Sequence, residues 1–475
     1  MERRIFKIYC GGQFIETSEK LEIHCSYTGG RVGITYLAGK KELETAIKRA
    51  QDVQVKMKDL PAYQKFKILR EISDELIRER YNLAQLIAQE ASKPLSSALG
   101  EVDRAAQTFL VAAEEAKRLP AEMMSADWTQ AGEGKEAIVK YFPVGIVAGI
   151  SPFNFPLNLT AHKIAPAIAA GCPIILKPAS FTPLSTLELA RIIDNTDLPG
   201  GAVSVLPMNR QTGNLLVTDP RISLLTFTGS AEVGWKMKEQ AGRKRVVLEL
   251  GGNAGVIISA TANLPVAAAK CAVGGFAYSG QVCIHTQRIY VEETVFEEFC
   301  DLFLDHVRKL RAGDPMDDMT QVSSLIDNDN AIRVKTWIDE AVKAGASVLI
   351  GGKRNGTFVE PTVITGTNAK MKVNSCEVFG PVVVLEPYTS FENAVAEINN
   401  TEFGLQAGVF TNQISEMNHA FRHIEAGGVI INDVPTFRVD HTPYGGIKNS
   451  GFGREGVKYS MMDMLEPKLL IKNTL

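Results

Sequence analysis

Cys283 is the residue of this sequence with the clearest capacity for covalent chemistry. It lies in the segment Gly280–Arg288 (Gly-Gln-Val-Cys-Ile-His-Thr-Gln-Arg), between an apolar stretch and a run with strand composition. A side chain at such a junction can reach a cleft, but a thiol attacks a carbonyl only as the thiolate. Its ordinary pKa of about 8.5 leaves little thiolate at neutral pH, so backbone N–H dipoles or a proton acceptor must lie nearby. Most cysteines are buried structural residues, and a nucleophilic role therefore needs support from other residues.

Six further motifs contain groups that a thiolate reaction needs. They are Pro152-Phe-Asn-Phe-Pro156, Lys177-Pro-Ala-Ser180, Phe227-Thr-Gly-Ser230, Leu248-Glu-Leu-Gly-Gly252, Glu377-Val-Phe-Gly-Pro381 and Pro443-Tyr-Gly-Gly446. The amide of Asn154 could stabilise an oxyanion, and the carboxylate of Glu249 could activate water. Each residue alone could equally be a turn former or a cap. Taken together with Cys283, they favour catalysis.

In order and spacing these motifs closely resemble those of the aldehyde dehydrogenase superfamily, over nearly the whole chain. The resemblance implies oxidation of an aldehyde to its carboxylic acid with NAD(P)+. By this resemblance Cys283 attacks the carbonyl carbon, while the Asn154 amide and the Cys283 backbone N–H stabilise the oxyanion. Hydride leaves to the nicotinamide, and Glu249 then activates the water that hydrolyses the thioester.

Two other functions stay open. A coenzyme A-acylating enzyme would pass the thioester to coenzyme A or phosphate, and Glu249 argues against it because this residue supplies water activation. A non-catalytic dinucleotide-binding protein on the same fold would be expected to have lost Cys283, Asn154 or Glu249, yet all three are present.

The cofactor-binding residues are expected at the carboxyl ends of parallel strands. Short apolar runs at 144–150, 174–177, 202–206, 223–227 and 246–250 alternate with helical segments, which is typical of a doubly wound parallel sheet. Segment Phe227–Gly234 has the pattern of a strand, a Gly-Ser turn and a helix whose first N–H groups would face a pyrophosphate. Segment Gly451–Gly456 matches G-x-G-x-x-G, but we interpret it as a loop because no strand–helix–strand unit follows.

The resemblance extends to individual cofactor contacts. Lys177 would hydrogen-bond the adenosine ribose, Glu377 would bind the nicotinamide ribose, and Phe379 would pack against the nicotinamide end. The full expected set is Ile150, Ser151, Pro152, Phe153, Lys177, Ser180, Arg210, Gly213, Phe227, Thr228, Gly229, Ser230, Val233, Leu250, Gly251, Glu377 and Phe379. Family members that prefer NAD often carry Glu where this chain has Ser180. Without that carboxylate a 2′-phosphate is not repelled, so NADP is favoured, although NAD is not excluded.

Polar residues are expected at the entrance of the substrate site. They are Asn158, His162, His285, Arg438 and Asp440. Such an entrance suits a small hydroxylated or anionic aldehyde, and the segment Phe437–Asp440 before Pro443-Tyr-Gly-Gly446 is most similar to the lactaldehyde dehydrogenase branch. Each histidine could instead be a hydrogen-bonded residue without a substrate role.

Composition excludes several other classes of protein. The chain has 475 residues, of which 22% are charged and 45% hydrophobic, with a net charge of -3. This balance indicates a soluble protein without electrostatic preference for nucleic acid or anionic membranes. Seven scattered cysteines without a Cys-x-x-Cys pair argue against a disulfide framework or a metal site and favour the cytoplasm. Neither a signal peptide nor a membrane-spanning segment is expected.

The length predicts two or three domains in an α/β fold. Residues 1–118 and 140–251 are expected to form the doubly wound cofactor-binding domain, including helices near 41–58, after Pro61 and at 94–118. Residues 252–440 are expected to form an α/β catalytic domain. Residues 119–139 and 457–475 would form a small β oligomerisation arm and tail. In the resembled family such a tail pairs with the hairpin of a partner subunit, which implies a homodimer or a homotetramer.

Overall fold

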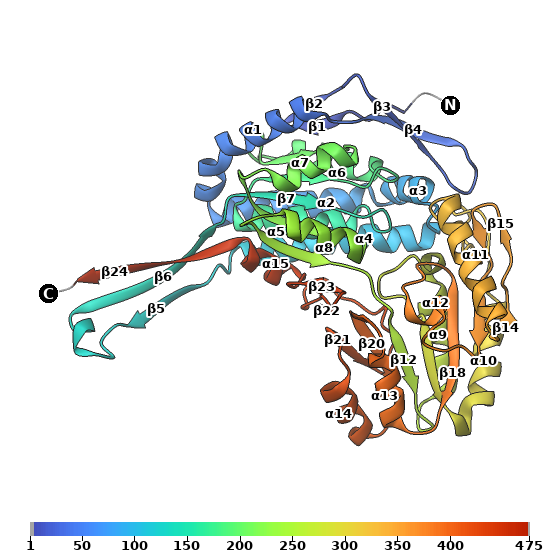
Figure 1. Cartoon of the computed structure of the whole chain (residues 1–475). Coiled ribbons are helices and arrows are strands. Elements are labelled where there is room, and N and C mark those ends of the chain that lie inside the picture. Colours follow the sequence, from blue (N-terminus) through green and yellow to red (C-terminus); the bar gives the residue numbers. More distant parts are fainter. Residues whose placement is uncertain (1–3, 474–475) are drawn as a thin grey trace.

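The computed structural model describes residues 4–473 and consists of two α/β units and a projecting β arm (Figure 1). The expected domain bounds at residues 1–3 and 474–475 lie outside the described residues. The α/β class and the parallel sheets predicted from the sequence are confirmed.

The first sheet has eight strands in the order β2-β1-β9-β8-β7-β10-β11-β23. These are β1 (Ile8–Cys10), β2 (Gln13–Ile15), β7 (Ile146–Ile150), β8 (Ile174–Lys177), β9 (Val203–Val205), β10 (Ile222–Thr228), β11 (Arg245–Glu249) and β23 (Gly451–Phe452). The five strands from β9 to β11 are parallel, whereas β1 and β23 pair antiparallel with their neighbours.

Helices cover both faces of this sheet. On β7, Val147 packs into one helical layer, while Ile146 and Ala148 pack into the other, as the two-residue period of a strand requires. One layer contains α2 (Ala62–Arg78), α3 (Arg80–Ala91), α4 (Leu95–Ala116), α5 (Asn158–Ala170) and α6 (Leu184–Asp194). The other contains α1 (Lys40–Asp59), α7 (Arg210–Thr218) and α8 (Ala231–Gln240). Every residue of α5 is buried, because α2 and α4 pack over its outer side.

The second sheet has seven strands in the order β14-β17-β18-β13-β12-β20-β21, all parallel except β14. They are β12 (Gly255–Ile258), β13 (Arg288–Glu292), β14 (Ser347–Ile350), β17 (Thr362–Thr365), β18 (Val382–Tyr388), β20 (Gln406–Phe410) and β21 (Gly428–Ile431). The helices packed around it are α9 (Leu264–Phe276), α10 (Phe296–Arg308), α11 (Asn328–Lys343), α12 (Lys372–Ser375), α13 (Phe391–Asn399) and α14 (Ile414–His423). Small hairpins complete the fold: β3 (Lys20–His24) with β4 (Arg31–Tyr36), β15 (Arg354–Asn355) with β16 (Phe358–Val359), and β19 (Phe403–Gly404) with β22 (Ile447–Lys448).

The arm is a three-stranded antiparallel sheet in the order β24-β6-β5. It is formed by β5 (Ala121–Ser125), β6 (Lys135–Pro143) and β24 (Leu465–Asn473), and it extends away from the two α/β units (Figure 1). Strand β24 pairs with β6 of its own chain along its whole length. The expectation that the tail pairs with the hairpin of a partner subunit was therefore wrong for this chain. The hairpin already offers β24 an unpaired edge within the same molecule.

Two expected boundaries and one expected loop also need correction. The division at residue 139 cuts through β6, whose ladder is continuous to Pro143. Residues 457–463 form a helix, α15 (Val457–Asp463), that packs against α5 and does not belong to the arm, because Val457 and Met461 are buried there. The glycine-rich stretch expected to be a loop begins as strand β23, which pairs with the edge of β11.

Candidate active site and cofactor site

The loop that carries Cys283 is held in an uncommon backbone conformation. Helix α9 ends at Phe276, and the next turn contains three residues with positive φ: Tyr278 (46°), Ser279 (55°) and Gly280 (72°). A Cβ at Gly280 would lie 2.0 Å from a backbone carbonyl oxygen, so only glycine fits there. This turn directs the following residues toward the carboxyl ends of the first sheet, where Cys283 is half-buried.

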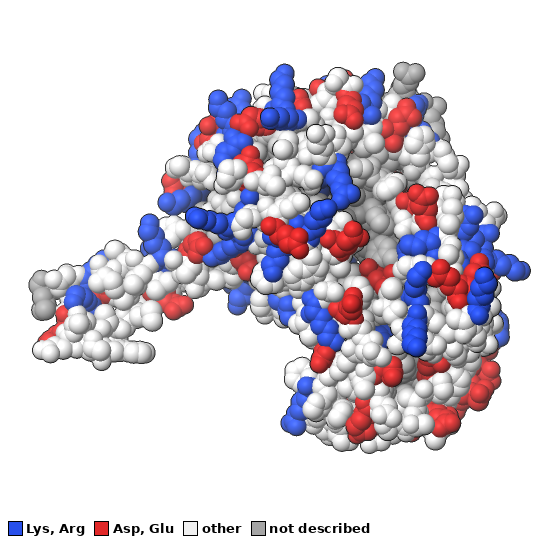
Figure 2. Space-filling model, viewed as in Figure 1, with Lys and Arg blue, Asp and Glu red and all other residues white. Residues whose placement is uncertain are grey.

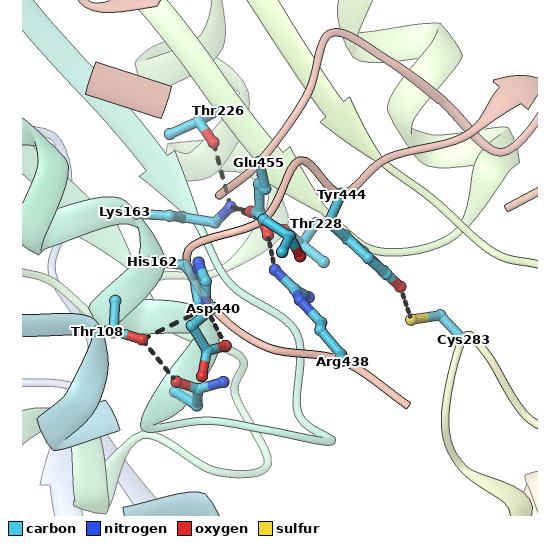
Figure 3. Close-up of polar contacts among 12 residues, drawn as sticks. Thr108, His162, Lys163, Thr226, Thr228, Cys283, Arg438, Asp440, Tyr444 and Glu455 are labelled. Atoms are coloured by element: carbon cyan, nitrogen blue, oxygen red, sulfur yellow. Dashed lines mark hydrogen bonds and ion pairs between the residues drawn. The ribbon is translucent and has the colours of Figure 1, made fainter. Parts of the chain in front are cut away.

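The sulfur of Cys283 contacts one hydroxyl group. The Tyr444 hydroxyl oxygen lies 3.0 Å from Sγ (Figure 3). Burial raises the pKa of the thiol to about 11, and the negative charges of Glu377 and Glu249 act in the same direction. The Tyr444 hydrogen bond and the positive charge of Arg438 oppose this rise in the pKa. The environment therefore contains both the groups that suppress the thiolate and the groups that favour it.

Asn154 lies between β7 and α5, beside the Cys283 loop. Its Nδ2 donates a hydrogen bond to the carbonyl oxygen of Gln281, 3.0 Å away, and its Oδ1 accepts one from the Phe155 N–H at 3.1 Å. The Asn154 amide is therefore fixed against Gln281, which precedes the nucleophile Cys283 by two residues. Because a carboxamide nitrogen has two N–H groups, one remains for an oxyanion.

Glu249 ends strand β11 and is buried. Neither of its carboxylate oxygens has a hydrogen-bond partner among residues 4–473. Burial and the nearby charge of Glu455 raise the pKa of Glu249 well above its ordinary value, although the charges of Arg438 and Lys163 counteract this rise. The backbone passes closely here, since a Cβ at Gly445 would lie 2.9 Å from Oε1. Glu249 is thus an unpaired buried carboxyl group that exchanges protons at a pH far above that of an ordinary glutamate.

A buried ion network lies next to these groups (Figure 3). Lys163 Nζ donates to Thr228 Oγ1 at 2.7 Å and to Thr226 Oγ1 at 3.1 Å, and lies 3.3 Å from Glu455 Oε1. The other oxygen of Glu455 accepts a hydrogen bond from Arg438 Nη2 at 3.1 Å. Although burial by itself raises the pKa of Glu455, the surrounding cations hold it at about 2. The network therefore contains a permanently ionised carboxylate beside the protonatable Glu249.

The polar residues expected at a substrate entrance are instead buried. They are Asn158, His162, His285, Arg438 and Asp440. Asp440 accepts a hydrogen bond from His162 Nε2 at 2.8 Å (Figure 3). It also accepts one from Arg104 Nη2 at 2.7 Å. His285 Nε2 hydrogen-bonds the Gly275 carbonyl oxygen at 2.8 Å, and burial lowers the pKa of this imidazole to about 4. These side chains therefore do not lie at an open surface entrance, and their contact with a substrate stays a prediction.

Seven of the residues expected to bind cofactor line a single cavity of about 600 Å³. They are Ile150, Lys177, Ser180, Arg210, Gly213, Phe227 and Val233. The remaining lining residues are Met208, Asn214, Lys236, Met237 and Gln240. Three cationic side chains and no acidic side chain line the cavity, and the side chain of Lys177 has no hydrogen-bond partner within residues 4–473. A polyanionic dinucleotide fits this chemistry. Two larger cavities, of about 700 and 760 Å³, lie near the N-terminal strands and contain none of the expected site residues.

Most of the other expected cofactor residues lie at or just after the carboxyl ends of β7, β10 and β11. Gly229 and Ser230 form the turn from β10 to α8, and Ser230 is the N-cap of that helix. Ser151, Pro152 and Phe153 follow β7, while Leu250 and Gly251 follow β11. Thr228 does not point its hydroxyl freely toward a ligand, because the oxygen accepts the hydrogen bond from Lys163.

Glu377 and Phe379 lie where the second unit meets this region. Glu377 Oε1 accepts a hydrogen bond from the Gly252 N–H at 3.1 Å, and burial raises the pKa of its carboxyl to about 7. Phe379 has a positive φ of 47°, and its ring meets that of Phe153 edge-on at 5.8 Å. Phe379 therefore contacts the first unit, and Glu377 lies against its last residues, since a Cβ at Gly251 would lie 2.2 Å from Glu377 Oε2.

Four residues of this region were assigned no role from the sequence: Lys163, Lys236, Tyr444 and Glu455. Lys163 carried a detectable signal, because it is the one ionised side chain in the otherwise apolar or neutral run of residues 158–170. Glu455 lies inside Gly451–Gly456, which was expected to be a loop without a role. Tyr444 lies in Pro443-Tyr-Gly-Gly446, a motif that carries the family resemblance but implied no role for the tyrosine. Within residues 4–473, no group of three or more His, Cys, Asp or Glu side chains is placed to hold a metal ion, and no helix is long and apolar enough to cross a membrane.

Comparisons with known proteins agree with this geometry. Residues 14–470 match the model of the aldehyde dehydrogenase family. The chain is 38% identical to a 3-sulfolactaldehyde dehydrogenase of Priestia aryabhattai over 98% of each chain, and 38% identical to a lactaldehyde dehydrogenase of Methanococcus aeolicus over 98% of this chain and 100% of that one.

Solved structures extend the similarity. Aldehyde dehydrogenase 21 of Physcomitrella patens, in complex with the reaction product succinate, superimposes with a TM-score of 0.98 at 42% identity and covers 100% of this chain and 99% of that one. The glyceraldehyde-3-phosphate dehydrogenase GapN of Methanocaldococcus jannaschii, complexed with NADP, gives a TM-score of 0.92 at 35% identity, covering 96% and 100%. With the thiol, the amide, the buried carboxyl group and the cationic cavity in these positions, the chain belongs to the aldehyde dehydrogenase family and is an NAD(P)-dependent aldehyde dehydrogenase.

Proposed function

We propose that this enzyme oxidises a small, polar, lactaldehyde-like aldehyde to its carboxylic acid by covalent catalysis at Cys283. The observation that carries the proposal is that the Asn154 amide hydrogen-bonds the Cys283 loop and that the unpaired, buried Glu249 is near enough to act on the Cys283 thiol. A cavity with cationic walls, lined by seven of the expected cofactor residues, supports it further. Cys283, Asn154 and Glu249 are the proposed catalytic residues.

The reaction divides into two halves at Cys283. The thiolate attacks the carbonyl carbon, and the Asn154 Nδ2–H and the Cys283 N–H stabilise the oxyanion of the thiohemiacetal. The nicotinamide cofactor accepts the hydride when it is bound, which leaves a thioester on Cys283. Glu249, once deprotonated, takes a proton from the water that attacks the thioester, and the Cys283 thiolate leaves as the acid forms.

Unpaired donors near the site support a polar substrate. Asn158 Nδ2 and Arg438 Nε are buried and have no hydrogen-bond partner among residues 4–473. Buried donors without partners cost stability, and a hydroxyl or anionic group of a substrate could satisfy them. The names of the relatives, which act on lactaldehyde and 3-sulfolactaldehyde, and the succinate bound to the Physcomitrella enzyme support the same class.

Kinetic assays across an aldehyde panel test this proposal. NADPH and NADH formation is measured with lactaldehyde, a sulfonated, a carboxylated and an unsubstituted aliphatic aldehyde, each with and without coenzyme A. Higher kcat/KM for the hydroxylated or anionic aldehydes, independent of coenzyme A, supports the proposal. A rate that depends on coenzyme A favours the acylating alternative, which Glu249 opposes. A preference for the aliphatic aldehyde contradicts the proposed substrate class.

We further propose that NADP is preferred over NAD. The cavity that contains Ser180 has Lys177, Arg210 and Lys236 in its wall, so a 2′-phosphate there would meet positive charge and no carboxylate. The single substitution Ser180→Glu should shift the ratio of kcat/KM toward NAD by about tenfold or more, since a charge-assisted contact contributes about 1.5 to 3 kcal/mol. The change should be mainly in KM for NADP, because the adenosine end is remote from hydride transfer.

Ser180→Gln provides the matched control, because it adds a side chain of the same size without charge. A ratio that stays constant in Ser180→Glu, or a strong preference of the wild type for NAD, would show that the 2′-phosphate is not recognised here. The catalytic assignment would be unaffected by that result.

The proposed division into units follows the corrected boundaries. Residues 4–118, 144–251 and 457–464 would bind the cofactor, residues 252–440 would form the catalytic unit, and residues 119–143 and 465–473 would form the arm. Figure 2 shows charges of both signs interspersed over the two units, whereas the arm is mostly uncharged in this view. Met123, Trp128 and Leu470 are among its exposed apolar residues. Exposed apolar surface of this kind supports self-association into a homodimer or homotetramer through the arm.

Light scattering after size-exclusion chromatography tests the arm. Leu470→Asp places a charge in the centre of the apolar surface and should reduce the assembly to a smaller species. Lys472→Asp on the same strand is the control, because that position is already charged and exposed. An unchanged molar mass for Leu470→Asp would exclude this face of the arm as the interface.

A further inference from the structure

The hydroxyl of Tyr444 is the only hydrogen-bonding group that contacts the Cys283 sulfur within residues 4–473. The two atoms are 3.0 Å apart, and the Tyr444 side chain is buried (Figure 3). Burial raises the pKa of Tyr444 well above its ordinary value, so the phenol keeps its proton at neutral pH. An O–H group facing a sulfur can donate a hydrogen bond, and a thiolate accepts such a bond more strongly than a neutral thiol does.

A fixed cation lies over the ring of the same tyrosine. The guanidinium carbon of Arg438 is 3.7 Å from the ring centroid of Tyr444. Arg438 is held there by its ion pair with Glu455, which in turn contacts Lys163. A cation over an aromatic face withdraws electron density from the ring, and this makes the phenolic O–H a stronger donor. A series of contacts from Lys163 through Glu455 and Arg438 to Tyr444 therefore ends at the Cys283 sulfur.

We propose that Tyr444 is a catalytic residue that stabilises the Cys283 thiolate by donating its phenolic hydrogen bond, and that Arg438 is a positioning residue that holds and strengthens this donor. This inference rests on the proposed role of Cys283 as nucleophile. The hydrogen bond does not remove the thiol proton, which passes to solvent. It favours the ionised sulfur twice: before attack on the aldehyde, and again when the thiolate is expelled from the thioester.

The charges that face the sulfur explain why such a donor is needed. Glu249 and Glu377 both disfavour the thiolate, whereas the positive charge of Arg438 favours it. Burial and these two carboxyl groups oppose ionisation of the Cys283 thiol. A hydrogen bond donated directly to the sulfur offsets part of this free-energy penalty. Loss of the hydroxyl should therefore move the ionisation of Cys283 to higher pH.

Alkylation kinetics of the full-length protein test the proposal. Tyr444→Phe removes the hydroxyl and keeps the ring beneath Arg438. The rate at which iodoacetamide modifies Cys283 is followed across a pH series by peptide mass spectrometry. Half-buried Cys376 of the same samples serves as the internal reference. In Tyr444→Phe we expect the pH midpoint of the Cys283 alkylation rate to rise by about one pH unit. Alkylation below that midpoint should therefore slow about tenfold.

A matched control is available in the same chain. The hydroxyl of Tyr388 is buried and has no hydrogen-bond partner within residues 4–473. Tyr388→Phe thus makes the same chemical change away from the site and should leave the Cys283 midpoint unchanged. In a stopped-flow burst assay, Tyr444→Phe should lose about tenfold in rate below the wild-type midpoint and recover at high pH. A merely structural defect would lower the rate at every pH.

The outcomes separate this inference from the proposed function. An unchanged Cys283 midpoint in Tyr444→Phe overturns the role of Tyr444, even if Cys283 remains essential. If Tyr444→Phe fails to fold, Arg438→Lys is measured instead: it keeps the charge opposite Glu455 but removes the planar guanidinium, and a smaller upward shift is expected. A Cys283 midpoint identical to that of the wild type in Arg438→Lys would then overturn the proposal. If Cys283 were not the nucleophile, the turnover of Cys283→Ser would show it, whereas the alkylation midpoints of Cys283 would not.

Discussion

Cys283→Ser is expected to lower steady-state turnover by about 10⁴-fold or more, because an alcohol at this position ionises far less readily than a thiol and no other residue can form the thioester. Binding of the cofactor should change by only a few fold, since the cavity that would hold its adenosine end is lined by residues of β7, β8, α7, α8 and β10 and not by the Cys283 loop. Turnover is measured by NAD(P)H absorbance, and cofactor binding by quenching of protein fluorescence.

Cys376→Ser is the matched control for this substitution. Cys376 is the other half-buried cysteine, and within residues 4–473 its sulfur has one hydrogen-bonding contact, with the neighbouring Ser375 hydroxyl. Turnover close to that of the wild type is expected for Cys376→Ser. Comparable activity in Cys283→Ser would remove Cys283 as the nucleophile, and loss of cofactor binding in that variant would point to a structural defect.

Glu249→Gln is expected to produce one rapid burst of reduced cofactor followed by a steady state about 10²- to 10⁴-fold slower than that of the wild type. Acylation precedes water activation, so the first hydride transfer survives while hydrolysis of the thioester stalls. The burst amplitude should approach one reduced cofactor per active site in stopped-flow measurements. Because neither carboxylate oxygen has a hydrogen-bond partner within residues 4–473, the amide substitution breaks no contact there, and the melting temperature should be preserved.

The absence of a burst would contradict this role. In that case Glu249 would act before hydride transfer, for instance as the base that deprotonates Cys283. Cys283→Ser is the negative control, since it should show neither burst nor turnover. Mass spectrometry of the quenched Glu249→Gln enzyme should detect the acyl group on Cys283.

The pH dependence of the wild type follows from the same carboxyl group. Burial and the Glu455 charge raise the pKa of Glu249 well above its ordinary value, and a general base works only when it is deprotonated. Deacylation should therefore accelerate as the pH rises through the raised pKa of Glu249 and slow as the pH falls below it. Single-turnover hydrolysis of the preformed thioester across a pH series measures this step. A flat profile would show that the carboxyl group is already ionised or not involved.

The local elements of the fold were predictable because they depend on short-range patterns. The alternation of buried β-branched strands with helices identified the parallel sheet, and β8 begins and ends at the residues expected from the sequence. The same patterns placed Asn154, Lys177 and Glu249 at strand ends, where the carboxyl ends of parallel strands meet. Helix and strand termini differed by a few residues, since the ends depend on contacts that lie outside the segment.

The pairing of distant segments was not predictable from the sequence. The edge of β6 is equally complementary to the chain's own tail and to that of another subunit, and proximity within the folded molecule selects its own. The polar residues near Arg438 were expected at the entrance of the substrate site because polar side chains usually face solvent. In the structure these polar side chains are buried, and hydrogen bonds to residues far away in the sequence compensate the loss of water, as between His162 and Asp440.

The sequence by itself determined the α/β class and the family and pointed to Cys283, Asn154 and Glu249 as the candidate catalytic residues, because these follow from local periodicity and from motifs read in order. Tertiary structure alone decided the pKa shifts of Cys283 and Glu249 and the partner of the Cys283 sulfur. Tyr444 contacts the sulfur from a segment about 160 positions later in the chain, and Arg438 of the same segment lies over the Tyr444 ring. The pKa of a buried group depends on charge, distance and solvent exclusion, and these exist only once the chain has folded.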